Sequence, residues 1–276
     1  MVTRTNDDYL LGTHDAEIQR LGLQHRVWRA RMLDAWRRAR FNLGHTLLDV
    51  GCGPGYATLD MAELVGRDGR VFAFDQSHRF ISVLEEGCRR RGIENVTTRV
   101  VDLETDSLEI TGADGAWCRW VLAFLENPRG LIQRIAAALR PGGRFVCHEY
   151  FDYLTWRLSP PCPELEEFAS LVAALWRDSG GEPDVALSVP GWLREAGFTV
   201  QVHRPIIDIV TRTDPVWEWP ASFVEVGLQR LVELGRVPEA RAHEISAAFN
   251  ACEAQEGTLM ITPGVMEIVA AKGSGD

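Results

Sequence analysis

The sequence of 276 residues contains no long hydrophobic run. No apolar stretch reaches the roughly 18 residues that a membrane-spanning helix needs. The segment 1–8 is polar and partly acidic, so it lacks the basic and apolar regions of a secretory signal. We therefore expect a cytoplasmic protein with no membrane partner.

Positive charge is also in short supply, because the formal net charge is −10. An acidic surface repels phosphate backbones, so we expect no nucleic-acid partner. One N-terminal segment is an exception, with a group of arginines that fits a solvated helix face and, as the sharper alternative, an anionic substrate or partner. These arginines are Arg26, Arg29, Arg31, Arg37, Arg38 and Arg40.

The cysteines form no C-x-x-C pair, and none has zinc-ligand spacing to a histidine. We therefore expect no metal site. Several of them lie in apolar runs, which predicts buried, reduced thiols in a cytosolic protein. The six are Cys52, Cys88, Cys118, Cys147, Cys162 and Cys252.

Residues 9–40 have helical periodicity, and after them short apolar runs alternate with helical patterns five times. This alternation predicts an α/β fold with a doubly wound parallel sheet, whose ligands bind beyond the carboxyl ends of the strands. The expected strands are 46–50, 70–75, 95–101, 115–121 and 144–148. The expected helices between them are 57–65, 78–91 and 129–139.

The C-terminal half has a different pattern. Residues 164–177 and 190–195 read as helices, and 198–212 as a long strand that Pro205 should bend or place near an edge. Residues 217–252 are mostly helical, and 258–271 return to strand character. No linker or repeat divides the chain. We expect one domain made of an N-terminal helical cap (1–43), a cofactor-binding core (44–150) and a substrate-side half (151–276) with a helical lid at about 215–256.

The strongest local signal is a glycine loop, Gly51-Cys-Gly-Pro-Gly55, between an expected strand and a helix. Glycines there let the backbone turn sharply and approach a ligand closely. The spacing G-x-G-x-G differs from the dinucleotide pattern G-x-G-x-x-G, and Tyr56 stands where that pattern has glycine. Asp49 suits a ligand that carries an ammonium and a sulfonium, and Pro54 removes a donor that a phosphate cradle would keep.

Two further carboxylates end expected strands. Asp75 follows the second strand and can accept hydrogen bonds from both ribose hydroxyls, although it could also cap the next helix, a role that Ser77 could take instead. Asp102, with Leu103, could address an adenine amino group and ring face, although a capping role in its loop is the alternative.

In this order and spacing, the motifs resemble the class I S-adenosylmethionine-dependent methyltransferases, especially the small-molecule group that contains the ubiquinone and menaquinone biosynthesis enzymes. The motifs are Leu48–Gly55, Asp75-Gln76, Asp102-Leu103, Trp120–Pro128 and Leu139–Phe145. The resemblance implies a Rossmann-like sheet of seven strands with the last one antiparallel, and a helical insertion between the last two. It also implies S-adenosyl-L-methionine as cofactor, leaves a homodimer open, and adds Cys52, Gln76, Arg119 and Trp120 to the residues that bind the cofactor.

The resemblance also indicates a substrate side. Where many relatives carry His-His this chain has Ala123-Phe124, which excludes a catalytic histidine there and predicts a more apolar pocket. Methyl transfer needs a base only when the nucleophile must lose a proton. Glu149, and as the second choice His148, are candidates for a base or substrate anchor at the end of the fifth strand, beside Tyr150. The alternative is that His148 is packed in the strand and that Glu149 caps a helix or pairs with an arginine. The expected substrate contacts are Phe124, Tyr153 and Trp156.

Aromatic residues add a hint about the substrate. Trp120, Trp156, Trp217 and Trp219 are expected around the pocket, which would suit a planar or apolar acceptor of secondary metabolism. In similar enzymes the region of Tyr9, Gln24, His25 and Trp28 closes over the cofactor.

Other functions fit the motifs less well. Amino-methylating enzymes of nucleic acids carry [DN]-P-P-[FYW] after the fourth strand, where this chain has Arg119-Trp-Val-Leu122; Ser159-Pro-Pro-Cys162 comes later and lacks the aromatic. An RNA or protein methyltransferase, or a relative that binds the cofactor without methylating, remains the alternative to a small-molecule methyltransferase.

Overall fold

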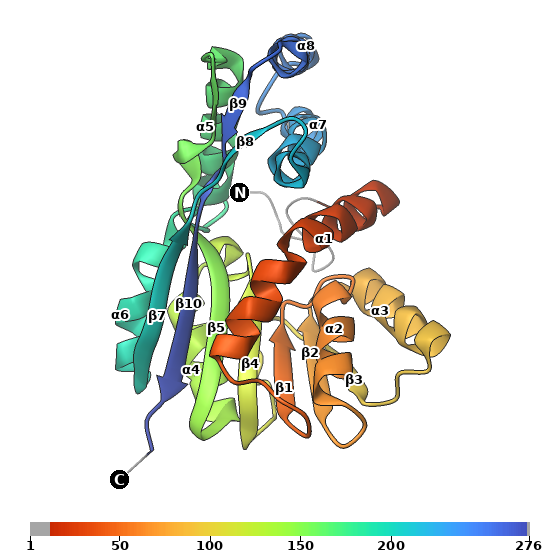
Figure 1. The fold of residues 1–276 in the computed structure, drawn as a ribbon, viewed down its shortest axis with the longest axis vertical. Helices are drawn as coiled ribbons and strands as arrows, with labels where there is room; N and C mark the ends of the chain where they lie inside the picture. The colour runs from red at the N-terminus through yellow and green to blue at the C-terminus, as the bar shows by residue number, and fades with distance from the viewer. Residues whose placement is uncertain (1–11, 275–276) are drawn as a thin grey trace.

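The computed structural model describes residues 12–274 and contains a seven-stranded sheet of order β3-β2-β1-β4-β5-β10-β7 (Figure 1). Parallel pairing joins β3 through β5, and β10 runs antiparallel to both β5 and β7. The predicted doubly wound sheet with an antiparallel last strand is therefore confirmed. Its strands are β1 Thr46–Val50, β2 Arg70–Asp75, β3 Val96–Val100, β4 Ala113–Arg119, β5 Leu139–Asp152, β7 Phe198–Ile206 and β10 Gly264–Lys272.

Helices cover both faces of this sheet because its central strands are apolar on both sides. Leu48 faces the core formed with α4 and α6, and its neighbour Leu47 faces the core formed with α1 and α2. The helices are α1 Asp15–Arg38, α2 Tyr56–Val65, α3 His78–Arg91, α4 Pro128–Ala138, α5 Pro163–Asp178, α6 Val189–Glu195, α7 Glu218–Glu233 and α8 Glu239–Ala254.

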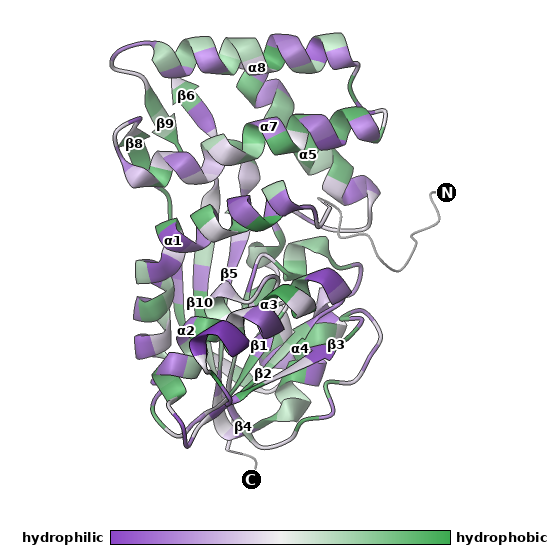
Figure 2. Cartoon of the chain, turned by 90° about the vertical axis from the view of Figure 1, so that its right-hand side faces the viewer, coloured by the Kyte–Doolittle hydropathy of each residue, from purple (hydrophilic) through white to green (hydrophobic). Residues whose placement is uncertain are grey.

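A second layer lies beyond the carboxyl ends of the parallel strands (Figures 1 and 2). It contains α5, α7, α8 and a small antiparallel sheet of order β6-β9-β8, which the sequence did not predict. Its strands are β6 Arg157–Ser159, β8 Ile209–Thr211 and β9 Leu259–Ile261. Helices α7 and α8 form the predicted insertion between the last two strands of the large sheet, and α1 runs between the two layers.

Strand β5 is much longer than predicted. It continues to Asp152 because β10 pairs with it as far as Gly264. His148, Glu149 and Tyr150 therefore lie inside the strand, and the prediction that they follow it is wrong.

The two long strands predicted in the C-terminal half are also corrected. The run 198–212 divides into β7 and β8, and the run 258–271 divides into β9 and β10, because each chain segment leaves the large sheet to join the small one. Pro205 lies in β7, the edge strand, where its missing N–H is tolerated as predicted.

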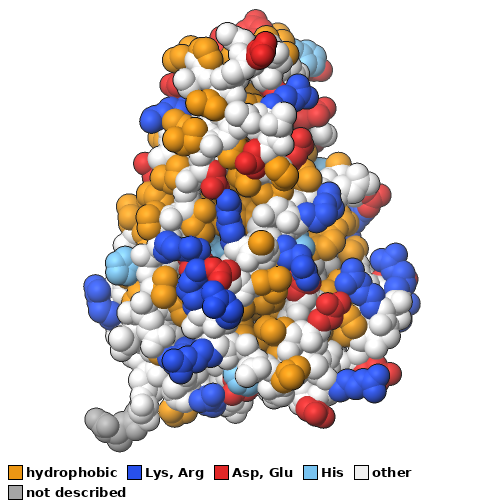
Figure 3. Space-filling view, viewed as in Figure 1, with side chains coloured by type: hydrophobic (Ala, Val, Ile, Leu, Met, Phe, Trp, Pro, Cys, Tyr) orange, Lys and Arg blue, Asp and Glu red, His pale blue; other side chains and the backbone are white. Residues whose placement is uncertain are grey.

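The arginines of α1 are largely paired. Figure 3 shows basic and acidic side chains intermixed on this face. Of the six arginines singled out in the sequence, four form ion pairs with carboxylates, which agrees with a solvated helix face, and Arg40 lies just beyond the end of α1. The pairs are Arg29–Asp60, Arg31–Asp208, Arg37–Asp34, and Arg38 with Asp34 and Glu267.

The cysteines, the helix lengths and the possible metal ligands can also be compared with the sequence. All six cysteines are free thiols and five are buried, whereas Cys252 is only partly buried. Within residues 12–274, no helix is both long and apolar enough to cross a bilayer. The same residues bring together no group of three or more His, Cys, Asp or Glu that could hold a metal ion.

Candidate active site

The glycine loop connects β1 to α2 and contains three left-handed residues. The φ angles of Gly51, Gly53 and Gly55 are 73°, 54° and 85°, values at which a side chain costs about 1–2 kcal/mol. A Cβ on Gly51 would overlap Val121, and one on Gly55 would overlap Leu84. A Cβ on Gly53 would meet no atom within 4 Å. Two of the glycines are therefore required for packing, and the third leaves open space beside the loop.

Asp75, at the carboxyl end of β2, holds this loop in place. Its Oδ2 accepts a hydrogen bond from the Gly53 N–H at 2.8 Å, and its Oδ1 accepts one from the Ser77 N–H at 2.9 Å. Ser77 caps α3 by accepting from the N–H of Phe80, so Asp75 is not needed as the helix cap. Burial raises the pKa of Asp75 to about 6. Gln76, beside it, is exposed.

Asp49 lies beneath the loop and is fully buried. It accepts a hydrogen bond of 2.6 Å from Thr58 Oγ1 of α2. Burial raises the pKa of Asp49 to about 7, while the hydrogen bond from Thr58 and the positive charge of Arg119 act in the opposite direction. Asp49 and Arg119 are close enough to interact electrostatically, but no hydrogen bond joins their side chains among the described residues.

Arg119, the last residue of β4, has a buried Nη1 with no hydrogen-bond partner in residues 12–274. Its guanidinium lies 5.2 Å from the ring centre of Trp120 and 6.0 Å from that of Trp117. Burial lowers the pKa of Arg119 to about 10, so the group is still charged at neutral pH. A buried charged donor without an acceptor suits an anionic group of a ligand.

The hydrogen bond between Thr58 and Asp49 gives a test of this pair. We expect Thr58→Val to raise the pKa of Asp49 further, because the bond stabilises the ionised carboxylate. An Asp49 that is neutral at pH 7 should bind a cationic ligand about tenfold more weakly, a loss of about 1.4 kcal/mol. Calorimetric titration with S-adenosylmethionine at pH 7 and pH 9 checks this. The loss should shrink at pH 9, and an equal loss at both values would contradict it.

The structure uses Asp102 in its own loop. The carboxylate accepts from the N–H of Glu104 at 2.8 Å and from Thr105 Oγ1 at 3.2 Å, which is the capping role left open above. Leu103 beside it is buried. The contact of these two residues with adenine stays a prediction.

Glu149 caps a short turn. Its Oε1 accepts from the N–H groups of Val121 and Leu122 at 2.8 and 2.9 Å, at the start of the 3₁₀ turn Leu122–Phe124. The side chain is fully buried, and burial raises its pKa to about 7. The capping alternative therefore describes Glu149 in this structure.

The raised pKa of Glu149 has a consequence for stability. Between pH 4.5 and 7 the folded protein holds a proton that the unfolded chain releases, so this group's contribution to stability falls as pH rises through that window. Glu149→Gln removes the titration and keeps an amide oxygen as acceptor. Relative to this variant, the wild type should lose up to about 3 kcal/mol between pH 4.5 and 7. Denaturant unfolding at several pH values measures the difference, and parallel pH profiles would contradict the assignment.

His148 is packed rather than presented to a cavity. Its ring lies between Trp28 and Trp117, with centroid distances of 5.5 and 5.0 Å, and its Nε2 is 3.5 Å from a carboxylate oxygen of Glu267. Burial lowers the pKa of His148. The imidazole of His148 is therefore part of the core, packed against Trp28 and Trp117.

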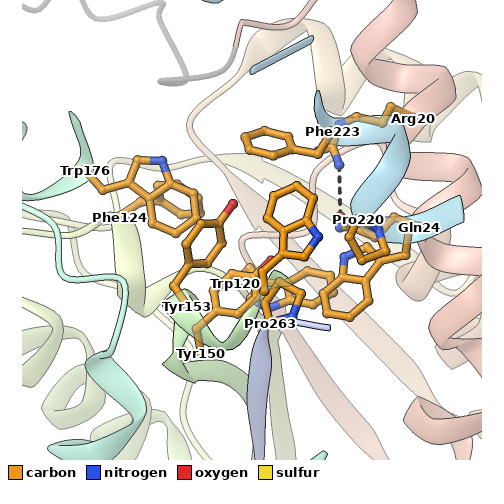
Figure 4. A pocket seen from close by; sticks show the side chains of 12 residues that line it. Arg20, Gln24, Trp120, Phe124, Tyr150, Tyr153, Trp176, Pro220, Phe223 and Pro263 are labelled. Atoms are coloured by element: carbon orange, nitrogen blue, oxygen red, sulfur yellow. Dashed lines mark hydrogen bonds between the residues drawn. The ribbon is translucent and has the colours of Figure 1, made fainter. Parts of the chain in front are cut away.

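An aromatic pocket lies beyond the carboxyl ends of β4 and β5, between α1 and α7 (Figure 4). Its volume is about 40 Å³, far below the roughly 300 Å³ at which small-molecule sites begin, so the pocket must widen to take a metabolite. The lining residues are Arg20, Gln24, Trp120, Phe124, Tyr150, Tyr153, Trp156, Trp176, Trp219, Pro220, Phe223 and Pro263.

This pocket begins next to the glycine loop. Trp120 lines it, while its neighbour Val121 packs against Gly51 and its neighbour Arg119 interacts with Asp49. Trp120 has a φ of 52°, a strained value for a tryptophan that is typical of functional sites. The consecutive residues Arg119, Trp120 and Val121 therefore connect the glycine loop to the aromatic pocket.

The pocket brings together residues that are far apart along the chain. Of the predicted substrate contacts, Phe124, Tyr153 and Trp156 all line it, as does Tyr150. His148 and Glu149 do not. Among the predicted tryptophans, Trp120 and Trp219 also line it.

Trp217, by contrast, does not line the pocket, and its indole N–H donates to Glu253 Oε1 at 2.7 Å. Trp176 and Arg20 were missed, because only the extended β5 and the position of α1 bring α5 and α1 to the cavity.

In the N-terminal helix, Gln24 lines the pocket and Trp28 packs edge-on against Trp120 at 5.1 Å. That this region closes over the cofactor stays a prediction. His25 bonds to Asp60 of α2 at 3.1 Å and stacks on Tyr56. The prediction for Tyr9 falls outside the described residues.

Known proteins resemble this chain both in the sequence around the glycine loop and in the fold. Residues 42–176 match the family described as "Methyltransferase domain". The chain is 32% identical to aklanonic acid methyltransferase of Streptomyces sp. over 37% of this chain and 47% of that protein. It is 27% identical to demethylmenaquinone methyltransferase of Geobacillus stearothermophilus over 46% of this chain and 53% of that protein.

Among solved structures, a putative methyltransferase from Bacillus halodurans superposes with a TM-score of 0.61 at 15% identity, covering 88% of this chain and 99% of that one. The chain spans about half the length of the two curated relatives named above. The matched residues contain the glycine loop, Asp75 and Arg119. Residues 42–176, just under half of this chain, are therefore similar to the methyltransferase family, and the fold is that of solved methyltransferase structures.

Proposed function

We propose that this protein transfers a methyl group from S-adenosyl-L-methionine to a small, planar or apolar metabolite. The observation that carries the proposal is the pairing of an open glycine loop with two unlike charges, Asp49 and Arg119, that no hydrogen bond joins. The amino acid end of the cofactor carries one ammonium and one carboxylate, which these two side chains complement.

Each residue has a distinct part in this proposal. Asp75 fixes the loop through its hydrogen bond from Gly53. When the cofactor is bound, Asp49 and Arg119 would hold its amino acid end, the Gly53 backbone would face the nucleoside, and Asp75 would accept from the ribose hydroxyls. Cys52, Gln76, Asp102, Leu103 and Trp120 complete the proposed cofactor contacts. S-adenosylmethionine supplies an activated methyl group when bound.

The chain's own contribution is then alignment and exclusion of water. The proposed pocket for the methyl acceptor is lined by Phe124, Tyr150, Tyr153 and Trp156. It lies next to the glycine loop, because Val121, the residue after Trp120, packs against Gly51. Among the three side chains proposed for proton transfer or anchoring, only Tyr150 lines that pocket, and we assign the anchoring role to it.

The small pocket supports a lid. Trp219 of α7 stacks on Trp120 at 5.5 Å, and Gln24 of α1 also lines the pocket. We propose that α7 and α8, within the substrate-side half, move outward to admit the acceptor and return before transfer. Closure of a lid over a bound substrate is a common way for enzymes to exclude water.

Methyl transfer is tested by incubation with S-adenosylmethionine that carries a tritiated methyl group, together with a panel of phenols, quinones and amines. We expect tritium in the extracted organic acceptor, and none with heat-denatured protein. Binding of the cofactor with no label in any acceptor class would favour the non-methylating alternative, and label in RNA or protein would overturn the small-molecule assignment.

A further inference from the structure

Three tryptophans of the pocket carry indole N–H groups without acceptors. Trp120, Trp156 and Trp176 are 8%, 1% and 3% exposed and all line the cavity. Their Nε1 atoms are buried and have no hydrogen-bond partner within residues 12–274. They come from three different parts of the chain: the end of β4, the segment after β5, and α5.

Such donors are costly. A buried N–H that is left without an acceptor loses about 1–3 kcal/mol relative to its hydrated state, and a buried indole normally finds a partner. Indoles outside the cavity lining differ among themselves: Trp217 donates to Glu253, whereas Trp28 and Trp36 also have a buried Nε1 without a partner in residues 12–274. What sets Trp120, Trp156 and Trp176 apart is that they lie on the wall of a cavity, where a ligand can supply the missing acceptor.

The side-chain hydrogen-bond acceptors among the described lining residues are the hydroxyls of Tyr150 and Tyr153 and the amide oxygen of Gln24. No Asp or Glu is among its described lining residues. Arg20 is held by both oxygens of Glu17 at 2.7 Å, and it donates to the Gln24 side-chain oxygen at 3.1 Å, which occupies that acceptor. The wall therefore favours ligand atoms that accept hydrogen bonds over ligand atoms that donate them.

The aromatic rings of the pocket indicate the shape of the molecule that would be methylated. The ring of Trp120 makes an angle of 15° with that of Trp219, at a centroid distance of 5.5 Å. It makes an angle of 19° with the ring of Tyr150, at 5.4 Å. Parallel aromatic faces suit a flat ring system. Figure 4 shows the labelled rings of Phe124, Tyr153 and Trp176 along the neighbouring wall.

Resting on the proposed function for this cavity, we infer that its substrate is a planar aromatic molecule that bears carbonyl or phenolate oxygens, recognised by the indole N–H groups of Trp120, Trp156 and Trp176. An aromatic amine that is protonated at neutral pH is disfavoured, because the wall offers donors and no carboxylate.

Three bicyclic probes of similar size test this: 1-indanone with a carbonyl, indane with neither donor nor acceptor, and 1-aminoindane with an ammonium. Binding is measured by calorimetry with the protein saturated with S-adenosylhomocysteine. We expect 1-indanone to bind about tenfold more tightly than indane, the equivalent of one hydrogen bond. Equal affinities, or tightest binding of 1-aminoindane, would overturn the inference.

The double variant Trp156→Phe, Trp176→Phe keeps aromatic rings and removes two donors. We expect it to weaken binding of 1-indanone about tenfold and to change binding of indane by less than twofold, so that the indane measurement accounts for lost volume. Trp36→Phe is the matched control, because its Nε1 is also buried and without a partner but lies outside the cavity. An equal loss in both variants would contradict recognition by the cavity donors.

Binding of S-adenosylhomocysteine to each sample separates the two proposals. If the folded wild type does not bind it, the proposed function fails. If it binds and 1-indanone shows no advantage over indane, only the inference about the substrate fails.

Discussion

Gly53→Ala should abolish tight cofactor binding while leaving the protein folded. The new Cβ would meet no protein atom within 4 Å, so the cost to folding is the left-handed backbone, about 1–2 kcal/mol. The methyl group would occupy the open side of the loop, where the nucleoside is proposed to lie. We expect the affinity for S-adenosylhomocysteine to fall at least tenfold, measured by calorimetry.

Two other glycines supply the comparison. Gly92 also has a left-handed φ, 63°, and open space around it, but it ends α3 away from the loop. Gly92→Ala should therefore cost similar stability and leave cofactor affinity unchanged. Gly55→Ala would collide with Leu84, and it should destabilise the fold by about 2–5 kcal/mol, from overpacking and backbone strain together. Full affinity in Gly53→Ala would show that the open side of the loop is not the ligand site.

Arg119→Met should separate binding from stability. The Nη1 of Arg119 has no partner among the described residues, and burying the charge lowers the pKa of the group, so removing it should cost little stability or none. The same change removes the proposed partner of the cofactor carboxylate. It also withdraws the positive charge that keeps the pKa of Asp49 from rising further. We expect a loss of about 10- to 100-fold in affinity for S-adenosylhomocysteine, as for a hydrogen bond to a charged group.

Arg31→Met is the comparison variant, since Arg31 also lies over a tryptophan ring and has a buried Nη1 without a partner among the described residues. Its Nη2 pairs with Asp208, and it lines a different hollow from the proposed site. Arg31→Met should leave affinity intact. Arg119→Lys should recover only part of the binding, because a lysine cannot bind a carboxylate with two parallel N–H groups. Unfolding of Arg119→Met under conditions in which Arg31→Met is folded would indicate a structural role instead.

Local patterns predicted the core of the fold well. The runs Arg70–Asp75 and His78–Arg91 have the predicted bounds, because a buried parallel strand and an amphipathic helix each leave a clear periodicity. The glycine loop was predictable for the same reason, since its left-handed angles require glycine.

Long-range pairing was not predictable in this way. The extension of β5 depends on β10, more than a hundred residues later, and it converts Glu149 from a residue after the strand into a buried cap. Trp176 reaches the pocket only because α5 folds back over that extension, and nothing in its local sequence distinguishes it from Trp217. The small sheet of β6, β8 and β9 has strands of three residues, too short to give a periodicity.

The central claim is that the loop at Gly51–Gly55, with Asp49, Asp75 and Arg119, binds S-adenosylmethionine. Calorimetric titration of the purified, folded chain with S-adenosylhomocysteine tests it most directly, with NADH as the competing nucleotide. The account predicts saturable binding of about one S-adenosylhomocysteine per chain and no heat with NADH. Binding of NADH, or a folded protein without affinity for S-adenosylhomocysteine, would contradict it.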